Sequence, residues 1–199
     1  MKKTIVLASA NPGKLREFAQ ILAAFEFEVV PQSQFKVPDV PETGLSFVEN
    51  ALIKARNAAQ HTGLPAMSDD SGIEVDALNG APGIYSARFA GTGASDEDNN
   101  TLLLEKLKEI PDAQRTARYH CVIVYMHYVN DPMPLIFQGT WEGSILREPR
   151  GKNGFGYDPF FYVPTHNCAA AQLSPKVKNS LSHRGQALRA LQTALRAIA

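Results

Sequence analysis

Apolar residues in the first third of the chain form short continuous runs followed by helically spaced positions. Residues 4–8 are a run typical of a buried strand. The next apolar positions recur at helical spacing: Leu15, Phe18, Ala19, Leu22 and Phe25. A second strand is predicted at residues 28–31, and a helix that starts from Ser46 has one apolar face: Phe47, Ala51, Ala55 and Ala58. The pattern predicts strand, helix, strand, helix.

The middle of the chain is richer in strand patterns. Residues 66–75 read as two apolar strand-like pieces joined by a short turn, with residues 73–77 alternating as the second piece. A capping box that starts at Ser95 predicts a helix ending before Pro111. Residues 116–129 give the longest strand signal. A turn at 130–132 then leads to two further predicted strands, at 135–138 and 140–146.

The last part of the chain predicts a strand at 160–163, a short helix opened by Ser174 and Pro175, and a final helix capped by Ser182. The final helix has an apolar face: Ala187, Leu188, Leu191, Leu195 and Ile198. Together the elements predict a mixed α/β fold with a long twisted central sheet, flanking helices and two lobes around a ligand cleft. Because repeats and linkers are absent from the sequence, residues 1–199 are predicted to form a single domain.

Composition and charge narrow the class of protein. The chain has 199 residues, 44% of them hydrophobic, which is enough for a packed core. Twenty basic and twenty acidic residues leave no net field for sequence-independent binding to nucleic acid or to an anionic membrane. The apolar start is too short for a signal or a membrane span, and Cys121 and Cys168 match neither a metal motif nor a disulfide framework. We therefore expect a reducing, cytoplasmic location.

Asp69 and Asp70 are the first candidates for chemistry. Adjacent carboxylates repel one another, so such pairs persist where a divalent cation neutralises them or where one acts as a base. Gly72 would let the backbone turn tightly beside them. The same segment also fits an Asx-type turn with two solvated aspartates, and the segment alone leaves both interpretations open.

A second candidate site is the loop between the first predicted strand and helix. Residues 9–14 place a hydroxyl, an amide, a glycine and a lysine at a helix start, where backbone N–H groups attract anions. Ala8 and Leu15 exclude a Walker A loop, and an ordinary capped helix start is the alternative. Glu42, in a loop ahead of the next helix, is a candidate ligand for a hard cation such as Mg²⁺.

The glycine-rich stretch 151–159 is the third candidate, since flexible backbone with two aromatic residues suits stacking on a base. A Rossmann loop is excluded because a strand-like run follows it. His183 and Arg184 fall in the first turn of the last helix, where the helix dipole disfavours cations, so their position suggests a ligand that needs hydrogen-bond donors. His120, His127 and Trp141 are interpreted as structural.

Six motifs in order along the chain resemble the inosine/xanthosine triphosphate pyrophosphatase family, which hydrolyses noncanonical purine nucleoside triphosphates. They are Ser9-x-Asn11-x-x-Lys14, Thr43-Gly44 with residues 47–55, residues 69–72 (DDSG), residues 80–88 (GAPGIYSAR), residues 154–159 (GFGYDP) and residues 182–185 (SHRG). The resemblance covers nearly the whole chain. It implies a homodimeric, Mg²⁺-dependent hydrolase with a nucleotide cleft that converts ITP, dITP and XTP to the monophosphate and pyrophosphate, cleansing the nucleotide pool.

The resemblance also implies roles for individual residues. Glu42 and Asp70 would bind the metal, and Asp70 would accept the proton of the attacking water. The phosphates would contact the first loop: Ser9, Ala10, Asn11, Pro12, Gly13 and Lys14. Further substrate contacts would come from Lys54, Ser71 and Lys178. The base pocket would consist of Phe155, Gly156, Tyr157, Asp158, His183 and Arg184.

Three other functions were weighed. A pyrophosphatase of the Maf-like group would act on other modified nucleotides, but the segments at 154–158 and 182–184 argue against it. A non-catalytic module that binds nucleotides or RNA through Lys14, Lys178 and Arg184 is disfavoured by the charge balance and the aspartate pair. A metal-binding structural protein is disfavoured because so few hard ligands usually need phosphate oxygens to complete a site.

Overall fold

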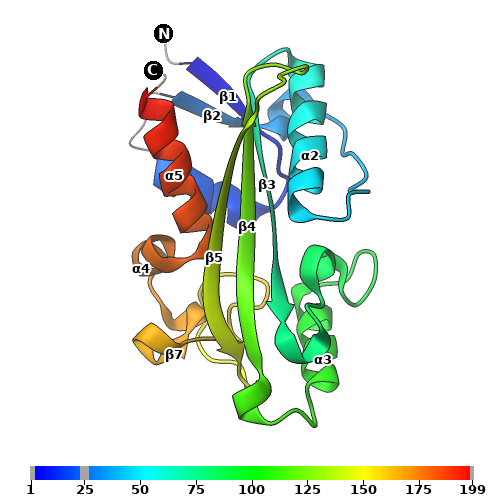
Figure 1. The fold of residues 1–199 in the computed structure, drawn as a ribbon, viewed down its shortest axis with the longest axis vertical. Helices are drawn as coiled ribbons and strands as arrows, with labels where there is room; N and C mark the ends of the chain where they lie inside the picture. The colour runs from blue at the N-terminus through cyan, green and yellow to red at the C-terminus, as the bar shows by residue number, and fades with distance from the viewer. Residues whose placement is uncertain (1–2, 23–26, 198–199) are drawn as a thin grey trace. The chain divides into compact units, whose positions relative to one another are not determined.

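The computed structural model describes residues 3–22 and 27–197, and its strands form one seven-stranded sheet (Figure 1). The strand order is β2–β1–β3–β4–β5–β6–β7. The strands are β1 (Lys3–Leu7), β2 (Phe27–Pro31), β3 (Ala66–Val75), β4 (Thr116–Met126), β5 (Leu135–Ile145), β6 (Phe161–Val163) and β7 (Cys168–Ala169). The α-helices are α1 (Pro12–Leu22), α2 (Phe47–Thr62), α3 (Asp96–Lys106), α4 (Pro175–Leu181) and α5 (His183–Ala197).

The chain divides into two compact units, each made of segments that are distant in sequence. Unit 1 consists of residues 1–70, 121–139 and 184–199, and unit 2 of residues 71–120 and 140–183. Strands β3, β4 and β5 contribute residues to both units. The mixed α/β fold with a central sheet and flanking helices, predicted from the sequence, is confirmed.

Unit 1 is a three-layer arrangement in which helices cover both faces of its strands. Strand β1 pairs in parallel with β2 and with β3. One core layer joins apolar residues of α1 and α5 to alternate residues of β1, β3 and β4: Ile5, Leu7, Phe18, Met67, Ile123 and Leu188 are examples. The other layer packs α2 on the intervening strand residues, for example Val6, Ala51, Ala55, Ala66 and Val124. Strand residues of opposite parity therefore face different helices.

Unit 2 has a separate core that is rich in aromatic side chains. Strand β6 pairs antiparallel with β5 and with β7. Tyr119, Trp141 and Phe161 pack together, with the ring centroids of Tyr119 and Phe161 4.6 Å apart. Leu103 of α3 and Leu107, the residue directly after this helix, join the cluster. The prediction that Trp141 is a structural core residue is therefore confirmed.

Predictions that depend on local capping signals agree with the structure. The Ser46 hydroxyl accepts the hydrogen bond from Glu49 N that caps α2, and Ser95 and Asp98 form the capping box of α3. Ser174 caps α4, whose first residue is Pro175, and α5 begins directly after Ser182. These interactions involve residues three apart in sequence, which is why the sequence shows them.

Two predicted boundaries are wrong. Residues 69–72 form no turn, because β3 runs unbroken from Ala66 to Val75 and Gly72 lies inside it. The predicted strands at 135–138 and 140–146 are one strand, β5, and Gly139 does not interrupt it. In both cases pairing with neighbouring strands overrides a local turn signal. Phe25 and Ile198 lie outside the described residues. Within the described ranges, no helix is long and apolar enough to cross a membrane.

Candidate active site

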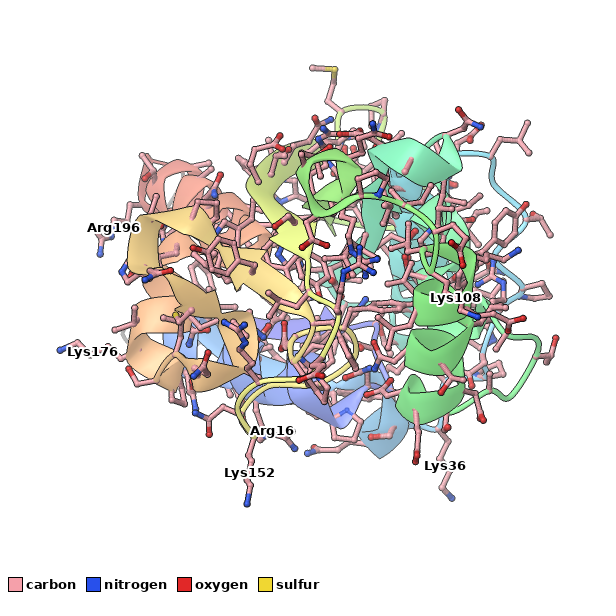
Figure 2. All side chains as sticks on the ribbon, turned by 90° about the horizontal axis from the view of Figure 1, so that it is seen from below. Arg16, Lys36, Lys108, Lys152, Lys176 and Arg196 are labelled. Atoms are coloured by element: carbon pink, nitrogen blue, oxygen red, sulfur yellow. The ribbon has the colours of Figure 1, made fainter. Side chains whose placement is uncertain are left out.

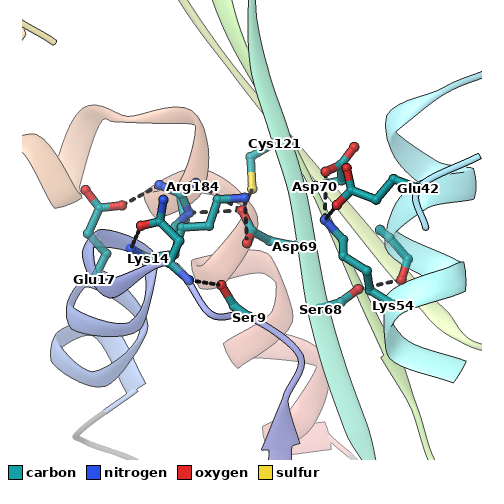
Figure 3. Close-up of polar contacts among 12 residues, drawn as sticks. Ser9, Lys14, Glu17, Glu42, Lys54, Ser68, Asp69, Asp70, Cys121 and Arg184 are labelled. Atoms are coloured by element: carbon teal, nitrogen blue, oxygen red, sulfur yellow. Dashed lines mark hydrogen bonds and ion pairs between the residues drawn. The ribbon is translucent and has the colours of Figure 1, made fainter. Parts of the chain in front are cut away.

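Strand alternation places the side chains of Asp69 and Asp70 on opposite faces of β3. Successive strand residues point to opposite sides, and both sides of β3 are covered by helices in unit 1. Asp69 follows the parity of Met67, which faces α1 and α5. Asp70 follows the parity of Ser68, whose hydroxyl donates to Ala51 O on α2 at 2.6 Å. Figure 3 shows the two carboxylates in separate polar groups on the two sides of the strand.

The Asp69 group is a buried chain of alternating charges. Lys14 Nζ lies 3.1 Å from Asp69 Oδ1, and Arg184 donates to Asp69 Oδ2 from Nε at 3.2 Å and from Nη2 at 3.0 Å. Arg184 Nη1 donates to Glu17 Oε2. The carboxylate of Asp69 is fully buried, and the Arg184 side chain is 3% exposed. These ion pairs join α1, β3 and α5.

The charges around Asp69 decide its ionisation. Burial by itself would raise the pKa of Asp69, but Lys14 and Arg184 outweigh this effect and the pKa lies well below its ordinary value. The pKa of Arg184 is raised, since Asp69 and Glu17 outweigh the effect of burial. The two carboxylates also offset the unfavourable position of Arg184 in the first turn of α5. Asp69 and Glu17 thus provide the hydrogen-bond acceptors for Arg184 that the sequence analysis expected from a ligand.

The Asp70 group lies on the α2 side of β3 and centres on Lys54. Lys54 Nζ is 2.7 Å from Asp70 Oδ1 and 2.8 Å from Glu42 Oε1. Only 8% of the Asp70 side chain and 16% of Lys54 are exposed, against 26% of Glu42. One ammonium group therefore stands between two carboxylates, which is the place a metal cation would take.

Asp70 has the opposite electrostatic character to Asp69. Burial raises the pKa of Asp70 above its ordinary value, and the attraction to Lys54 and Lys14 only partly opposes it. For Lys54, burial acts to lower the pKa, but Asp70, Asp69 and Glu42 outweigh it and the pKa is raised. Asp70 Oδ2 is buried and has no hydrogen-bond partner among the described residues. That oxygen is available for a cation or a water proton.

The loop that carries Glu42 is held by the first turn of α2. Asn50 Oδ1 accepts from Gly44 N at 2.8 Å, and Glu49 Oε2 accepts from Leu45 N at 2.8 Å. A Cβ on Gly44 would approach Glu49 Cβ to 2.5 Å, so the close approach of this loop to the helix requires glycine. Asn50 is fully buried and lies one helical turn before Lys54. The helix thus fixes both the backbone beyond Glu42 and its carboxylate.

The donor set fits a hard divalent cation. The described residues contain no group of three or more histidines, cysteines or acids arranged to hold a metal. Glu42 and Asp70 provide two carboxylates, and the unpartnered Asp70 Oδ2 is a free ligand position. Mg²⁺ is typically bound by one or two carboxylates, with water and substrate phosphates completing its coordination.

The loop of residues 9–14 follows β1 at its carboxyl end, the edge where open α/β sheets bind ligands. Asn11 Oδ1 accepts from Lys14 N at 3.0 Å, so Asn11 caps α1. Ser9 Oγ accepts from Asn11 N at 3.2 Å. Ala10 and Pro12 are exposed, and Gly13 is buried. The predicted capped helix start is present, and contact with a phosphate stays a prediction.

The predicted base-binding residues of unit 2 form a second polar group around Asp158. Lys178 Nζ donates to Asp158 Oδ2 at 2.5 Å, and Phe155 N donates to the same oxygen at 2.9 Å. Lys178 Nζ also lies 4.9 Å from the centroid of the Phe155 ring. Asp158 Oδ2 fills the space that a Cβ on Gly154 would need, and Gly154 has φ +79°. Asp158 therefore fixes the conformation of its own loop by bonding to Phe155 N and packing against Gly154.

Other predicted residues of unit 2 lie near this group or near the aromatic core. The His183 ring stacks on Tyr119, with centroids 4.6 Å apart and an interplanar angle of 8°. Tyr157 OH donates to Ser86 O at 2.7 Å, and burial raises the pKa of Tyr157. Ser71, the residue after Asp70 in β3, is half-buried. No contact of these residues with a base is part of the structure, so their substrate roles stay predictions.

The candidate basic residues are more buried than most other lysines and arginines, although Arg115 is buried too. Arg16, Lys36, Lys108, Lys152, Lys176 and Arg196 are exposed, and Figure 2 shows their side chains extending away from the ribbon. Lys14 and Lys54 are instead partly buried against carboxylates, and Lys178 and Arg184 are buried. A lysine or arginine is rarely buried unless it is paired. The sequence analysis missed Glu17, the partner of Arg184, because the two residues lie 167 positions apart in the chain.

Fold and site together define an α/β protein with a mixed sheet, in which two carboxylate–cation groups lie on opposite faces of β3. A family model described as the Ham1 family matches residues 5–194. The chain belongs to the Ham1 family. This confirms the resemblance found in the sequence.

Relatives and solved structures agree with this assignment. A protein of Vibrio parahaemolyticus named dITP/XTP pyrophosphatase is 60% identical over 189 residues, which cover 95% of this chain and 94% of the relative. A protein of Coxiella burnetii with the same name is 56% identical over 191 residues, 96% of each chain. The structure of a HAM1 protein from Coxiella burnetii superposes with a TM-score of 0.91 at 55% identity, covering 98% of this chain and 99% of that one. For the Staphylococcus aureus Ham1 protein the TM-score is 0.87 at 43% identity, with 99% and 100% covered.

Proposed function

We propose that this protein hydrolyses dITP, ITP and XTP to the nucleoside monophosphate and pyrophosphate. The observation that carries the proposal is the Asp70 group, in which Lys54 lies between two carboxylates and Asp70 Oδ2 is buried without a partner. The names of the similar proteins from Vibrio parahaemolyticus and Coxiella burnetii supply the substrate class. They favour this function over a Maf-like enzyme or a non-catalytic module.

Glu42 and Asp70 would hold Mg²⁺, which neutralises phosphate charge and makes a bound water more acidic. Lys14 and Lys54 add positive charge where the triphosphate is most negative. Lys14 already faces Asp69, which is not a proposed metal ligand, so Lys14 is held in position before substrate arrives. Preorganised charges of this kind stabilise a transition state without having to reorient during the reaction.

Asp70 is the proposed general base. It would take a proton from water through Oδ2, while the water oxygen forms a bond to the α-phosphorus. The bond from that phosphorus to the bridging oxygen breaks, and pyrophosphate leaves with the bonding electron pair. Its position in β3, with Oδ2 buried and free of a hydrogen-bond partner among the described residues, suits it to accept that proton.

The base would be selected by the residues predicted from the sequence. Phe155, Gly156, Tyr157 and Asp158 form the loop proposed to stack on and bond to the purine, together with Lys178 and His183. Hypoxanthine and xanthine carry an oxygen at C6, where adenine carries an amino group. Donors opposite C6 would satisfy that oxygen and leave adenine mismatched, so ATP would be a poor substrate.

Mg²⁺ as the metal, a homodimer and a cytoplasmic role in cleansing the nucleotide pool complete the proposal. They rest on the family resemblance. Analytical ultracentrifugation at working concentration tests the dimer, and a monomer would remove that part.

Release of pyrophosphate across a substrate panel tests the activity. The panel contains dITP, ITP, XTP, dATP, dGTP and TTP, each measured with Mg²⁺ and with EDTA. We expect Mg²⁺-dependent pyrophosphate release from dITP, ITP and XTP and little from the other three. Release of single phosphate, or equal rates on all six, would contradict the proposal.

A further inference from the structure

Helix α3 holds both polar groups of one residue in the predicted base loop. Asp96 Oδ2 accepts from Gly156 N at 2.7 Å, and Asn100 Nδ2 donates to Gly156 O at 3.0 Å. Asp96 and Asn100 are four residues apart, so they project from the same face of the helix. Both belong to unit 2, as does the loop. A rigid helix thus fixes the backbone of Gly156 from two sides.

The position of Gly156 determines how the loop presents its side chains. It stands between Phe155, whose ring lies beside Lys178 Nζ, and Tyr157, which bonds to Ser86 O. Gly156 has φ +60°, a conformation that other residues rarely adopt. Rotation of its peptide groups would change the direction of the Phe155 ring. The bonds from α3 hold these peptide groups in one orientation.

We propose that Asp96 and Asn100 are positioning residues for base selection, acting through Gly156. The inference rests on the proposed function, in which residues 155–158 contact the purine. When the binding groups of a loop are held in position to within a fraction of an ångström, only the correct base fits them. A looser loop can adjust and bind the wrong base as well. The sequence analysis predicted this helix from its capping box and gave it no role in substrate selection.

The two residues differ in burial, which sets the size of their effects. Asn100 is 8% exposed, whereas Asp96 is exposed on the first turn of α3. Water competes with the bond to Asp96 and hardly with the bond to Asn100, so loss of the Asn100 amide leaves the Gly156 carbonyl without its partner. Asn100→Ala is therefore expected to have the larger effect.

The test measures kcat/KM on dITP and dATP for Asn100→Ala, Asp96→Ala, Asp96→Asn and Glu97→Ala. Glu97 is the matched control, because it is an exposed acid in the same helical turn and would lose the same interaction with the helix dipole. We expect the dITP/dATP ratio to fall about tenfold in Asn100→Ala and about threefold in Asp96→Ala. Asp96→Asn keeps an acceptor oxygen and should retain the ratio, as should Glu97→Ala.

Two further readouts separate positioning from general damage. Inhibition by pyrophosphate reports on the phosphate-binding residues and should stay the same in all four variants. Backbone hydrogen exchange at residues 154–158, measured without substrate, should be faster in Asn100→Ala and Asp96→Ala than in Glu97→Ala.

The outcomes distinguish this inference from the proposed function. A wild-type protein that releases no pyrophosphate from dITP overturns the proposed function, whatever the exchange rates. If the wild type is active and selective but Asn100→Ala keeps its dITP/dATP ratio, the positioning role is wrong. Unchanged exchange in both alanine variants would show that α3 does not hold the loop.

Discussion

Asp69 and Asp70 are neighbours in one strand, yet the protein gives them opposite environments. Asp69 faces α1 and α5, contacts two cations, and has a lowered pKa. Asp70 faces α2, shares one cation with Glu42, and has a raised pKa. Both are buried, so burial does not explain the difference. The number of cations on each face of β3 does.

This contrast explains how two adjacent carboxylates coexist inside a protein. A flexible turn would bring them to the same side, where they would repel one another. The strand points them apart and gives each a separate set of partners. Asp69 has a cation at each of its oxygens and serves as a structural anchor, while Asp70 Oδ2 has neither an ion pair nor a hydrogen-bond partner among the described residues. The predictions below alter one side of this contrast at a time.

Asp69→Asn should have the largest effect on stability. It breaks the ion pairs of Asp69 with the partly buried Lys14 and the buried Arg184, and breaking a buried ion pair by removing one partner costs about 3–5 kcal/mol. Urea unfolding should show this loss of unfolding free energy. Asp70→Asn is the matched control, because it removes a carboxylate that has only one cation. Equal stability of the two variants would contradict the contrast.

Asp70→Asn should instead abolish most of the activity while the fold remains. Loss of a positioned general base lowers turnover by about 10²-fold or more. Steady-state rates on dITP measure it, and circular dichroism checks the fold. Glu105→Gln, a change of an exposed acid on α3, is the control and should remain active. A folded Asp70→Asn variant with nearly full activity would show that the base is another residue.

Asn50→Ala should weaken metal binding on the Asp70 side without changing a proposed ligand. The variant releases Gly44 N and so loosens the loop that carries Glu42. Residues that orient metal ligands typically contribute about 10- to 100-fold in affinity. We expect the Mg²⁺ concentration for half-maximal activity to rise about tenfold, and Mn²⁺ binding followed by electron paramagnetic resonance to weaken in parallel.

Gln60→Ala is the control for that experiment, since Gln60 is exposed further along α2. It should bind Mn²⁺ as the wild type does. If Asn50→Ala binds Mn²⁺ normally, α2 does not position Glu42 through this bond.

The sequence predicted those features that depend on neighbours in the chain. Ser46, Ser95 and Ser174 cap helices within three residues, and the apolar faces of α2 and α5 follow from spacing alone. The elements of the sheet were likewise visible as apolar runs. These signals are local, so one sequence is enough to read them.

The turn predicted at Asp69 was wrong for a physical reason. Two charged residues and a glycine are typical of a turn, and only ion pairs with residues far along the chain make a buried strand possible there. Arg184 lies 115 residues from Asp69. Asn50, Asp96 and Asn100 were missed because each acts through a backbone group of another segment. Backbone partners leave no pattern in side-chain identity.

The smallest expected effect concerns pH. The contributions of Asp69 and Asp70 to the stability of the fold should change in opposite directions as the pH rises. The folded pKa of Asp69 is below its unfolded value, so Asp69 stabilises the fold above the unfolded pKa, and this contribution is lost as pH falls below it. The folded pKa of Asp70 is above its unfolded value, so its contribution is present below the unfolded pKa and is lost as pH rises through the folded one.

Removing Asp70 should therefore make the protein relatively more stable at neutral pH than at pH about 4, compared with the wild type. Removing Asp69 should have the opposite effect and make the protein relatively less stable at neutral pH than at pH about 4, compared with the wild type. Urea unfolding of the wild type, Asp69→Asn and Asp70→Asn between these pH values measures both slopes, with EDTA present so that no cation binds Asp70. The two carboxylates are adjacent aspartates, so their unfolded pKa values are nearly equal. If both substitutions change the pH dependence of the unfolding free energy with the same sign, the two faces of β3 do not differ electrostatically.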